Sequence, residues 1–210
     1  MPNSNKPWKQ GRKQRGVKPR ELQRLLILCE DTKSSVLYFR KFKFDENEVE
    51  IACVGTGKNT DSLAEEAIAR EKKARDAGKP YQQIWVVFDR DSFPPANLGR
   101  AFDLMRAHPK IEPCLSNECF ELWYLLHFDF CDTPVNRHNL GKILSSKIGV
   151  PYDKADGKIY DHLESRMNTA LKHADRLERR NHELRTHREN PSTRVHHLVR
   201  LLRKFAPSSE

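Results

Sequence analysis

The chain has 210 residues, of which 37% are hydrophobic and 32% are charged, and its formal net charge is +9. This length allows one domain with appendages or two small domains, no apolar run approaches the roughly 20 residues that a membrane helix needs, and no apolar signal region follows the N-terminus. Five scattered cysteines without a C-x-x-C pair disfavour a disulfide or zinc framework, so we expect a protein of the reducing cytoplasm that does not enter a membrane.

Basic residues are concentrated at the two ends of the chain. Residues 1–20 contain seven Lys and Arg and no acidic residue, and residues 172–204 contain ten Lys and Arg against four acids. Such segments attract phosphate backbones, so we expect contact with a nucleic acid; solubility, or steering toward an acidic protein, is the alternative. Because residues 1–22 are also rich in Pro and Gly and can bury little, we expect them to form a disordered basic tail.

Strand-like and helix-like segments alternate after this tail. Apolar runs predict four strands, at residues 24–30, 49–54, 83–89 and 111–116. Periodic or capped segments predict helices, at residues 34–42, 62–77, 96–108 and 119–127. This alternation predicts an α/β domain over residues 23–130, with a parallel sheet of about four strands and flanking helices.

The remaining residues, 131–206, are predicted to form a helical C-terminal region. Its helices are expected at residues 137–146, 159–186 and 193–205. Serines are predicted to begin two helices of the α/β domain. Ser34 is the expected N-cap of the first helix, and Ser62 with Glu65 matches a capping box for the second.

Carboxylates follow two of the predicted strands. Glu30 ends the first strand, and Asp89 and Asp91 end the third, two residues apart, so that their side chains point the same way in an extended chain. Ligands of open α/β sheets bind at the carboxyl ends of strands, and Glu30 joins the aspartates if the two strands are neighbours. Clustered carboxylates repel each other, and a raised pKa, basic partners or a hard cation relieves this repulsion. Mg²⁺ prefers oxygen ligands. We therefore predict a Mg²⁺ or Mn²⁺ site here; the alternative is that the aspartates only begin a turn.

Two polar residues follow the fourth predicted strand. Asn117 and Glu121 lie where the chain passes from this strand into a helix. They are candidates for the wall of the acidic site, because that strand also ends at the same edge of the sheet. A helix cap and a favourable charge at the helix N-terminus are the alternative roles.

Three basic residues are candidates for contact with the site or with a nucleic acid. Lys58 lies in the Gly-rich segment Gly55–Thr60, which lacks the Walker A pattern but could bind an anion through backbone N–H groups; a connecting turn is the alternative. Lys33 could offset the carboxylates or touch a phosphate, and His196 could act as an acid or base. Both could equally be ordinary surface or hydrogen-bonded side chains.

Longer stretches resemble a known family. A Glu after the first strand with Asp-x-Asp after the third resembles the TOPRIM fold of topoisomerases, primases and several nucleases, although Asp31 stands where those proteins usually have Gly. The finer resemblance is to the RloB family, whose members accompany an ATPase in bacterial phage-defence and abortive-infection loci. It rests on these stretches, in the family's order over about residues 25–200: Ile27–Glu30, Gly55–Thr60, Val87–Phe93, Ser116–Phe128 and Asn190–His196.

The resemblance implies a Mg²⁺-dependent nuclease that acts on RNA, including tRNA, or on DNA in phage defence, together with an ATPase partner encoded nearby. Glu30, Asp89 and Asp91 would then be both its catalytic and its metal-binding residues. Two alternatives stay open. One is a non-catalytic effector or adaptor subunit that docks on an ATPase through its helical C-terminal part. The other is a small nucleic-acid-binding protein in which the acidic residues are only structural.

Overall fold

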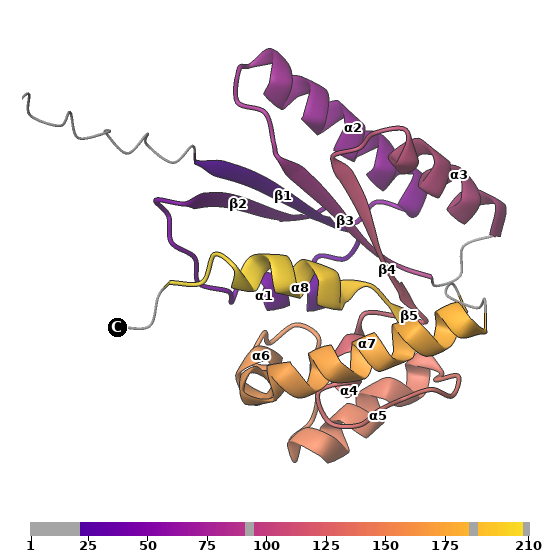
Figure 1. Cartoon of the computed structure of the whole chain (residues 1–210). Coiled ribbons are helices and arrows are strands. Elements are labelled where there is room, and N and C mark those ends of the chain that lie inside the picture. Colours follow the sequence, from indigo (N-terminus) through magenta and orange to yellow (C-terminus); the bar gives the residue numbers. More distant parts are fainter. Residues whose placement is uncertain (1–21, 91–94, 185–188, 208–210) are drawn as a thin grey trace, which may run out of the picture.

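A five-stranded sheet forms the centre of the molecule (Figure 1). The computed structural model describes residues 22–90, 95–184 and 189–207. The strands are β1 (Gln23–Cys29), β2 (Val49–Gly55), β3 (Gln83–Asp89), β4 (Ile111–Asn117) and β5 (Ser192–Thr193). Their order is β2-β1-β3-β4-β5, and all pairs are parallel except β4 with β5. The predicted α/β class and its four strands are confirmed, and the first and third strands are neighbours.

The fifth strand was not predicted from the sequence. It consists of Ser192 and Thr193, which pair with Asn117 and Ser116 at the end of β4. The hydroxyl groups of Ser116 and Thr193 lie 2.9 Å apart, and both side chains are buried. Two polar residues carry no apolar strand pattern, so only their pairing with a distant strand identifies β5.

Each predicted helix has a counterpart in the structure, and one of them is divided in two. Their bounds are α1 (Ser34–Phe39), α2 (Thr60–Asp76), α3 (Pro95–Arg106), α4 (Glu121–Leu125), α5 (Arg137–Ile148), α6 (Ile159–Leu163), α7 (Met167–Glu183) and α8 (Val195–Arg203). The long helix predicted over 159–186 is divided, because the 3₁₀ turn Glu164–Arg166 separates α6 from α7.

Helices cover both faces of the sheet (Figure 1). Leu26 and Leu28 of β1 belong to an apolar core that the sheet shares with α2 and α3. Ile27 and Cys29 point to the opposite face, where they belong to a larger core with α1 and the helices from α4 onward. This alternation follows from the two-residue period of a strand, and a strand buried on both faces explains the nearly continuous apolar runs in the sequence.

The helices of the C-terminal region pack on the same face as α1 and α4. Leu140 of α5, Leu177 of α7 and Leu198 of α8 are buried in one core with Ile27 of β1 and Trp123 of α4. Residues 131–206 therefore share a core with the sheet and also contribute β5 to it. Within the described residues, no helix combines the length and apolarity that crossing a bilayer requires.

Both predicted helix caps are wrong. Ser34 is the first residue of α1, and its hydroxyl donates to Glu121 instead of capping the helix. Asp31 takes the capping role, because its carboxylate accepts the backbone N–H groups of Lys33 (2.7 Å) and Ser35 (3.1 Å). Helix α2 begins two residues earlier than expected, since Asn59 accepts the N–H of Ser62 at 3.0 Å.

Candidate active site

The carboxyl ends of β1 and β3 bring Glu30 and Asp89 together. Glu30 directly follows β1, and its backbone N–H donates to the carbonyl oxygen of Val87 at 2.9 Å. Asp89 is the last residue of β3, and its backbone N–H donates to Oε2 of Glu30 at 3.1 Å. The parallel pairing of the two strands therefore places the carboxylate of Glu30 against the backbone of Asp89. Asp91, the third predicted carboxylate, lies outside the described residues.

Glu121 adds a buried carboxylate to this region. It begins α4, and only 3% of it is exposed. Its Oε1 accepts hydrogen bonds from the hydroxyl groups of Ser34 and Tyr152, both at 3.0 Å, and lies 3.1 Å from Nζ of Lys154. A buried carboxylate needs such partners, and these come from α1 and from the segment between α5 and α6.

A pocket of about 290 Å³ lies between these side chains. Its walls come from the loop after β1, the end of β3, the start of α4 and the segments around α5. The charged residues that line it are Glu30, Asp31, Asp89, Glu121, Lys33, Arg137 and Lys154. The pocket therefore combines four carboxyl groups with three cationic side chains.

The pKa shifts show that the positive charges do not offset all of the carboxylates. Burial raises the pKa of Asp89 well above its ordinary value, and the charges of Glu121, Glu30 and Asp31 raise it further. Burial also raises the pKa of Glu30, against the hydrogen bond from the N–H of Asp89. Burial acts on Glu121 in the same direction, but the charge of Lys154 and hydrogen bonds leave its pKa lowered. Glu30 and Asp89 thus form a place that favours an added cation.

The loop after β1 lies directly against the end of β2. A Cβ atom at Gly55 would lie 2.5 Å from the carbonyl oxygen of Asp31 and 2.8 Å from the Cα atom of Thr32, so a glycine is needed at this close approach. The carbonyl oxygens of Cys29 and Glu30 accept the backbone N–H groups of the next two residues, 56 and 57, each at 2.9 Å. Contacts with β2 therefore hold the loop that carries Glu30.

The Gly-rich segment uses its backbone donors inside the chain. Besides the two N–H groups that bind the end of β1, the N–H of Lys58 donates to Oγ1 of Thr56 at 3.1 Å. The ammonium of Lys58 lies 3.0 Å from Glu66 of α2. Gly57 lines the pocket, but Lys58 is not among its lining residues. These contacts agree with the connecting-turn alternative for Gly55–Thr60.

The other predicted residues are divided between the pocket and more distant places. Lys33 is exposed and lines the pocket beside the carboxylates. Asn117 is buried at the end of β4, opposite Ser192, and does not line it. His196 is fully buried in α8, where its Nε2 lies 3.1 Å from Glu178 of α7, and it also is not a lining residue.

Sequence reasoning missed Arg137 and Lys154, which line the pocket, and Tyr152, which contacts one of its carboxylates. Arg137 begins α5, and its charge lowers the pKa of both Glu30 and Asp89. Tyr152 and Lys154 come from the segment between α5 and α6 and contact Glu121. No local pattern marks these residues, because their role depends on how the helical region folds back over the strand ends.

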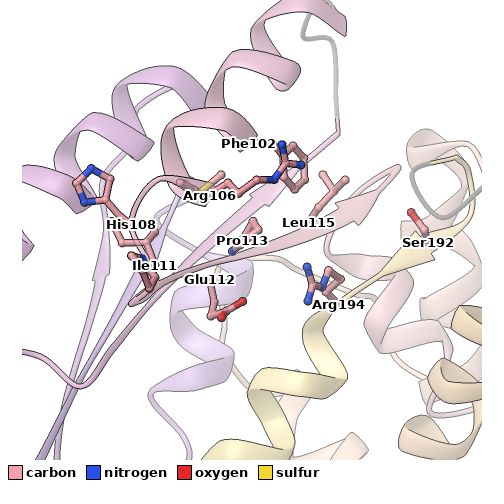
Figure 2. A pocket seen from close by; sticks show the side chains of 11 residues that line it. Phe102, Arg106, His108, Ile111, Glu112, Pro113, Leu115, Ser192 and Arg194 are labelled. Atoms are coloured by element: carbon pink, nitrogen blue, oxygen red, sulfur yellow. The ribbon is translucent and has the colours of Figure 1, made fainter.

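A second cavity, of about 370 Å³, lies at the outer edge of β4 (Figure 2). Figure 2 shows Phe102 and Arg106 of α3 on one side, Glu112 and Leu115 of β4 below, and Arg194 beside β5. Its lining includes none of the site residues that the sequence predicted. The carboxylate pocket therefore remains the candidate active site, because Glu30 and Asp89, whose pKa values are raised, line it together with other charged residues.

Comparison with known proteins gives one match. Neither the curated proteins nor the solved structures include a match to this chain. The model of a protein family described as RloB-like protein matches residues 25–202, which include the sheet, the carboxylate pocket and the C-terminal helices. The mostly parallel sheet with flanking helices is also consistent with a TOPRIM-like fold. The chain therefore belongs to the RloB-like family.

Proposed function

We propose that this protein is a nuclease that requires Mg²⁺ or Mn²⁺. The observation that carries the proposal is the gathering of Glu30, Asp89 and Glu121 in one pocket at the strand ends, beside cationic side chains. Carboxylates and cations at one such place suit a phosphodiester substrate, since the first bind a metal and the second bind phosphate oxygens.

The residues of the pocket fit a hard divalent cation. Its donors are carboxylate oxygens, and burial, with smaller contributions from neighbouring acidic side chains, raises the pKa of Glu30 and Asp89, so a cation there would favour their ionised forms. Glu30 and Asp89 would hold the ion, with Asp91 as a further predicted ligand and Glu121 on the adjoining wall. A bound Mg²⁺ supplies charge neutralisation at a phosphate and lowers the pKa of a coordinated water.

The chain's cationic side chains would bind and orient the substrate. Arg137, Lys33 and Lys154 line the pocket, and about half of the Lys154 side chain is exposed. A guanidinium can grip a phosphate with two parallel hydrogen bonds, whereas an ammonium acts as a point charge. The net charge of +9 supports a nucleic acid, RNA or DNA, as the substrate.

The biological setting that we propose follows from the family. Members of the RloB family are expected to act in phage defence with an ATPase partner, and we propose the same for this chain. A second candidate function, that of a non-catalytic adaptor bound to the ATPase, is favoured by one observation. Glu121 already has three partners within the chain, as a purely structural carboxylate does.

A cleavage assay tests the nuclease. Labelled tRNA and plasmid DNA are incubated with the protein and Mg²⁺, Mn²⁺ or EDTA. We expect cleavage that EDTA abolishes and that Glu30→Gln or Asp89→Asn lowers by at least about 100-fold, in the range typical of lost catalytic groups. The matched control is Asp103→Asn, which removes an exposed carboxylate of α3 outside the pocket. A variant Asp89→Asn that remains folded and cleaves as the wild type does would refute the proposal.

If neither substrate is cleaved, the adaptor is tested in cells. The adaptor predicts that Glu30→Gln and Asp89→Asn keep the protective effect against phage. The nuclease predicts that both substitutions abolish it while the amount of folded protein stays the same.

A further inference from the structure

A second cluster of ligand-type side chains lies between α7 and α8. The carboxylate of Glu178 in α7 contacts two consecutive histidines of α8. Its Oε2 lies 3.1 Å from Nε2 of His196, and its Oε1 lies 2.9 Å from Nε2 of His197. The two imidazole rings lie close together, with centroids 4.0 Å apart. The side chains of adjacent helix residues ordinarily point in different directions. Here both rings contact the same carboxylate, that of Glu178.

The spacing of these atoms is close to what a tetrahedral zinc site requires. Two ligand atoms bound about 2.1 Å from zinc, at a tetrahedral angle, lie about 3.4 Å from each other. The two nitrogen-to-oxygen distances, which involve different oxygens of the Glu178 carboxylate, are each within about half an ångström of that value, and one ligand atom from each of the three residues lies within 4.8 Å of the others. Small side-chain shifts would bring the three atoms to a single ion.

The protonation states also suit a metal at neutral pH. Hydrogen bonding to His196 holds the pKa of Glu178 down to about 2, so its carboxylate is ionised. Burial and the neighbouring His197 lower the pKa of His196 despite the opposing charge of Glu178, so its imidazole is neutral. For Glu178 and His196 these are the forms that bind metals.

The cluster is accessible from solvent on one side. About a third of the His197 side chain and two-fifths of the Glu178 side chain are exposed, while His196 is fully buried. A cavity of about 260 Å³, which His182 and Arg194 also line, adjoins Glu178. A water molecule could therefore complete the coordination of an ion held by three protein ligands.

We propose that Glu178, His196 and His197 form a binding site for Zn²⁺ or a similar transition-metal ion, separate from the carboxylate pocket. Two imidazoles and one carboxylate select such ions over Mg²⁺, which prefers oxygen ligands alone. The ion binds Nε2 of both histidines, whose single ring protons then lie on Nδ1, and joins α7 to α8, next to the strand β5 that borders the same cavity.

The surroundings of His196 indicate how tightly the site should bind a metal ion. Coordination through Nε2 leaves the ring proton on Nδ1, and Nδ1 of His196 is buried with no hydrogen-bond partner among the described residues. Loss of such an outer partner typically weakens metal binding by about 10–100-fold. We therefore expect reversible binding that is weaker than that of a closed structural zinc centre.

Zn²⁺ uptake by the full chain tests this proposal. The protein is stripped with a chelator and titrated with Zn²⁺ in buffer that contains Mg²⁺, and the bound zinc is measured by equilibrium dialysis with elemental analysis. We expect one equivalent, and at least about tenfold weaker binding in His197→Gln and in Glu178→Gln. His197 is the first choice because it is partly exposed, whereas replacing the buried His196 could perturb the fold.

Two control variants establish whether the zinc is held by this cluster. His162→Gln removes an exposed imidazole of α6, outside this cavity, and should leave the zinc affinity unchanged. Glu30→Gln should also leave it unchanged, because it alters only the carboxylate pocket. If His197→Gln lowers the melting temperature but binds zinc as the wild type does, Glu178 only links the two helices and the proposal is overturned. Failure of the wild type to bind zinc overturns it equally.

Discussion

Nζ of Lys154 lies 3.1 Å from Oε1 of Glu121, so an ammonium group already stands beside the most buried carboxylate of the pocket. The two residues come from different segments, since Glu121 begins α4 and Lys154 follows α5. In the free protein this contact supplies positive charge that a divalent ion would otherwise bring. The positive charge of Lys154 therefore reduces the negative potential that would attract a metal ion to the pocket.

Substitution of Lys154 should strengthen metal binding. Lys154→Met removes the competing charge, and we expect Mn²⁺ to bind about 2- to 5-fold more tightly, which corresponds to the ~1 kcal/mol of a partly exposed ion pair. Isothermal titration calorimetry or the electron paramagnetic resonance signal of free Mn²⁺ measures the affinity. The matched control is Lys33→Met, a lysine of the same pocket for which no contact with Glu121 is seen in the described structure. Equal effects of both substitutions would contradict a specific role of Lys154.

The raised pKa of Asp89 predicts how stability depends on pH in metal-free protein. A carboxyl whose pKa is higher in the folded state than its ordinary value of 3.8 binds more protons when folded. Its contribution to the free energy of unfolding is therefore full below pH 3.8 and is lost as the pH rises through the folded-state pKa. Asp89→Asn cannot ionise and should be more stable than the wild type at neutral pH, by a margin that shrinks as the pH falls.

Urea denaturation at several pH values, in the presence of EDTA, measures this margin. Asp103→Asn serves as the control because Asp103 is exposed and should show no comparable trend. Added Mg²⁺ should reverse the order of stability, since only the wild type keeps the full set of ligands. A margin that grows toward low pH would show that the charge of Asp89 is not the destabilising group.

The role of Asp31 can be separated from metal binding by two substitutions. Its carboxylate accepts the N–H groups of Lys33 and Ser35 and the hydroxyl of Ser35. Asp31→Ala removes these acceptors and should lower the free energy of unfolding by about 0.5–2 kcal/mol. Asp31→Asn keeps one of the two acceptor oxygens, so it should lose less stability than Asp31→Ala. If Asp31 only caps α1, Asp31→Asn also keeps most of the Mn²⁺ affinity; a large loss of affinity would identify it as a ligand.

The elements that could be predicted from the sequence are those with a strong local pattern. The buried strands β1 and β3 are continuous apolar runs, and the carboxyl groups at their ends follow from the rule that parallel strands end at one edge. Glu121 was found in the same way, from its place after the fourth strand. In contrast, β5 is only two residues long, and it exists because Ser192 and Thr193 meet the end of β4.

Contacts between distant segments explain why one helix cap was predicted wrongly and why two pocket residues were missed. Ser34 has the composition of an N-cap, but its hydroxyl is used by Glu121, 87 residues later in the chain. Arg137 and Lys154 reach the pocket only because α5 and the segment after it fold over the strand ends. A charged residue in a helical region gives no sign of such a destination, since most charged residues of this kind are solvated.

Gly55 of β2 lies against the loop after β1, which carries Glu30. Gly55→Ala places a Cβ atom 2.5 Å from the carbonyl oxygen of Asp31 and 2.8 Å from the Cα atom of Thr32, and both are backbone atoms that cannot simply rotate away. We expect a loss of about 1–3 kcal/mol in the free energy of unfolding, as for other overpacked sites. Gly99→Ala is the control, because a Cβ atom there meets nothing within 4 Å in helix α3 and should be neutral or stabilising.

Gly55→Ala should also affect metal binding at the proposed site. Relief of the clash requires the loop after β1 to move away from β2, and this loop carries Glu30 away from the N–H of Asp89. Gly55→Ala should therefore weaken Mn²⁺ binding even at a urea concentration and temperature at which the protein is fully folded, whereas Gly99→Ala should not. If Gly55→Ala destabilises the protein but binds Mn²⁺ with unchanged affinity, the position of Glu30 does not depend on its contact with β2.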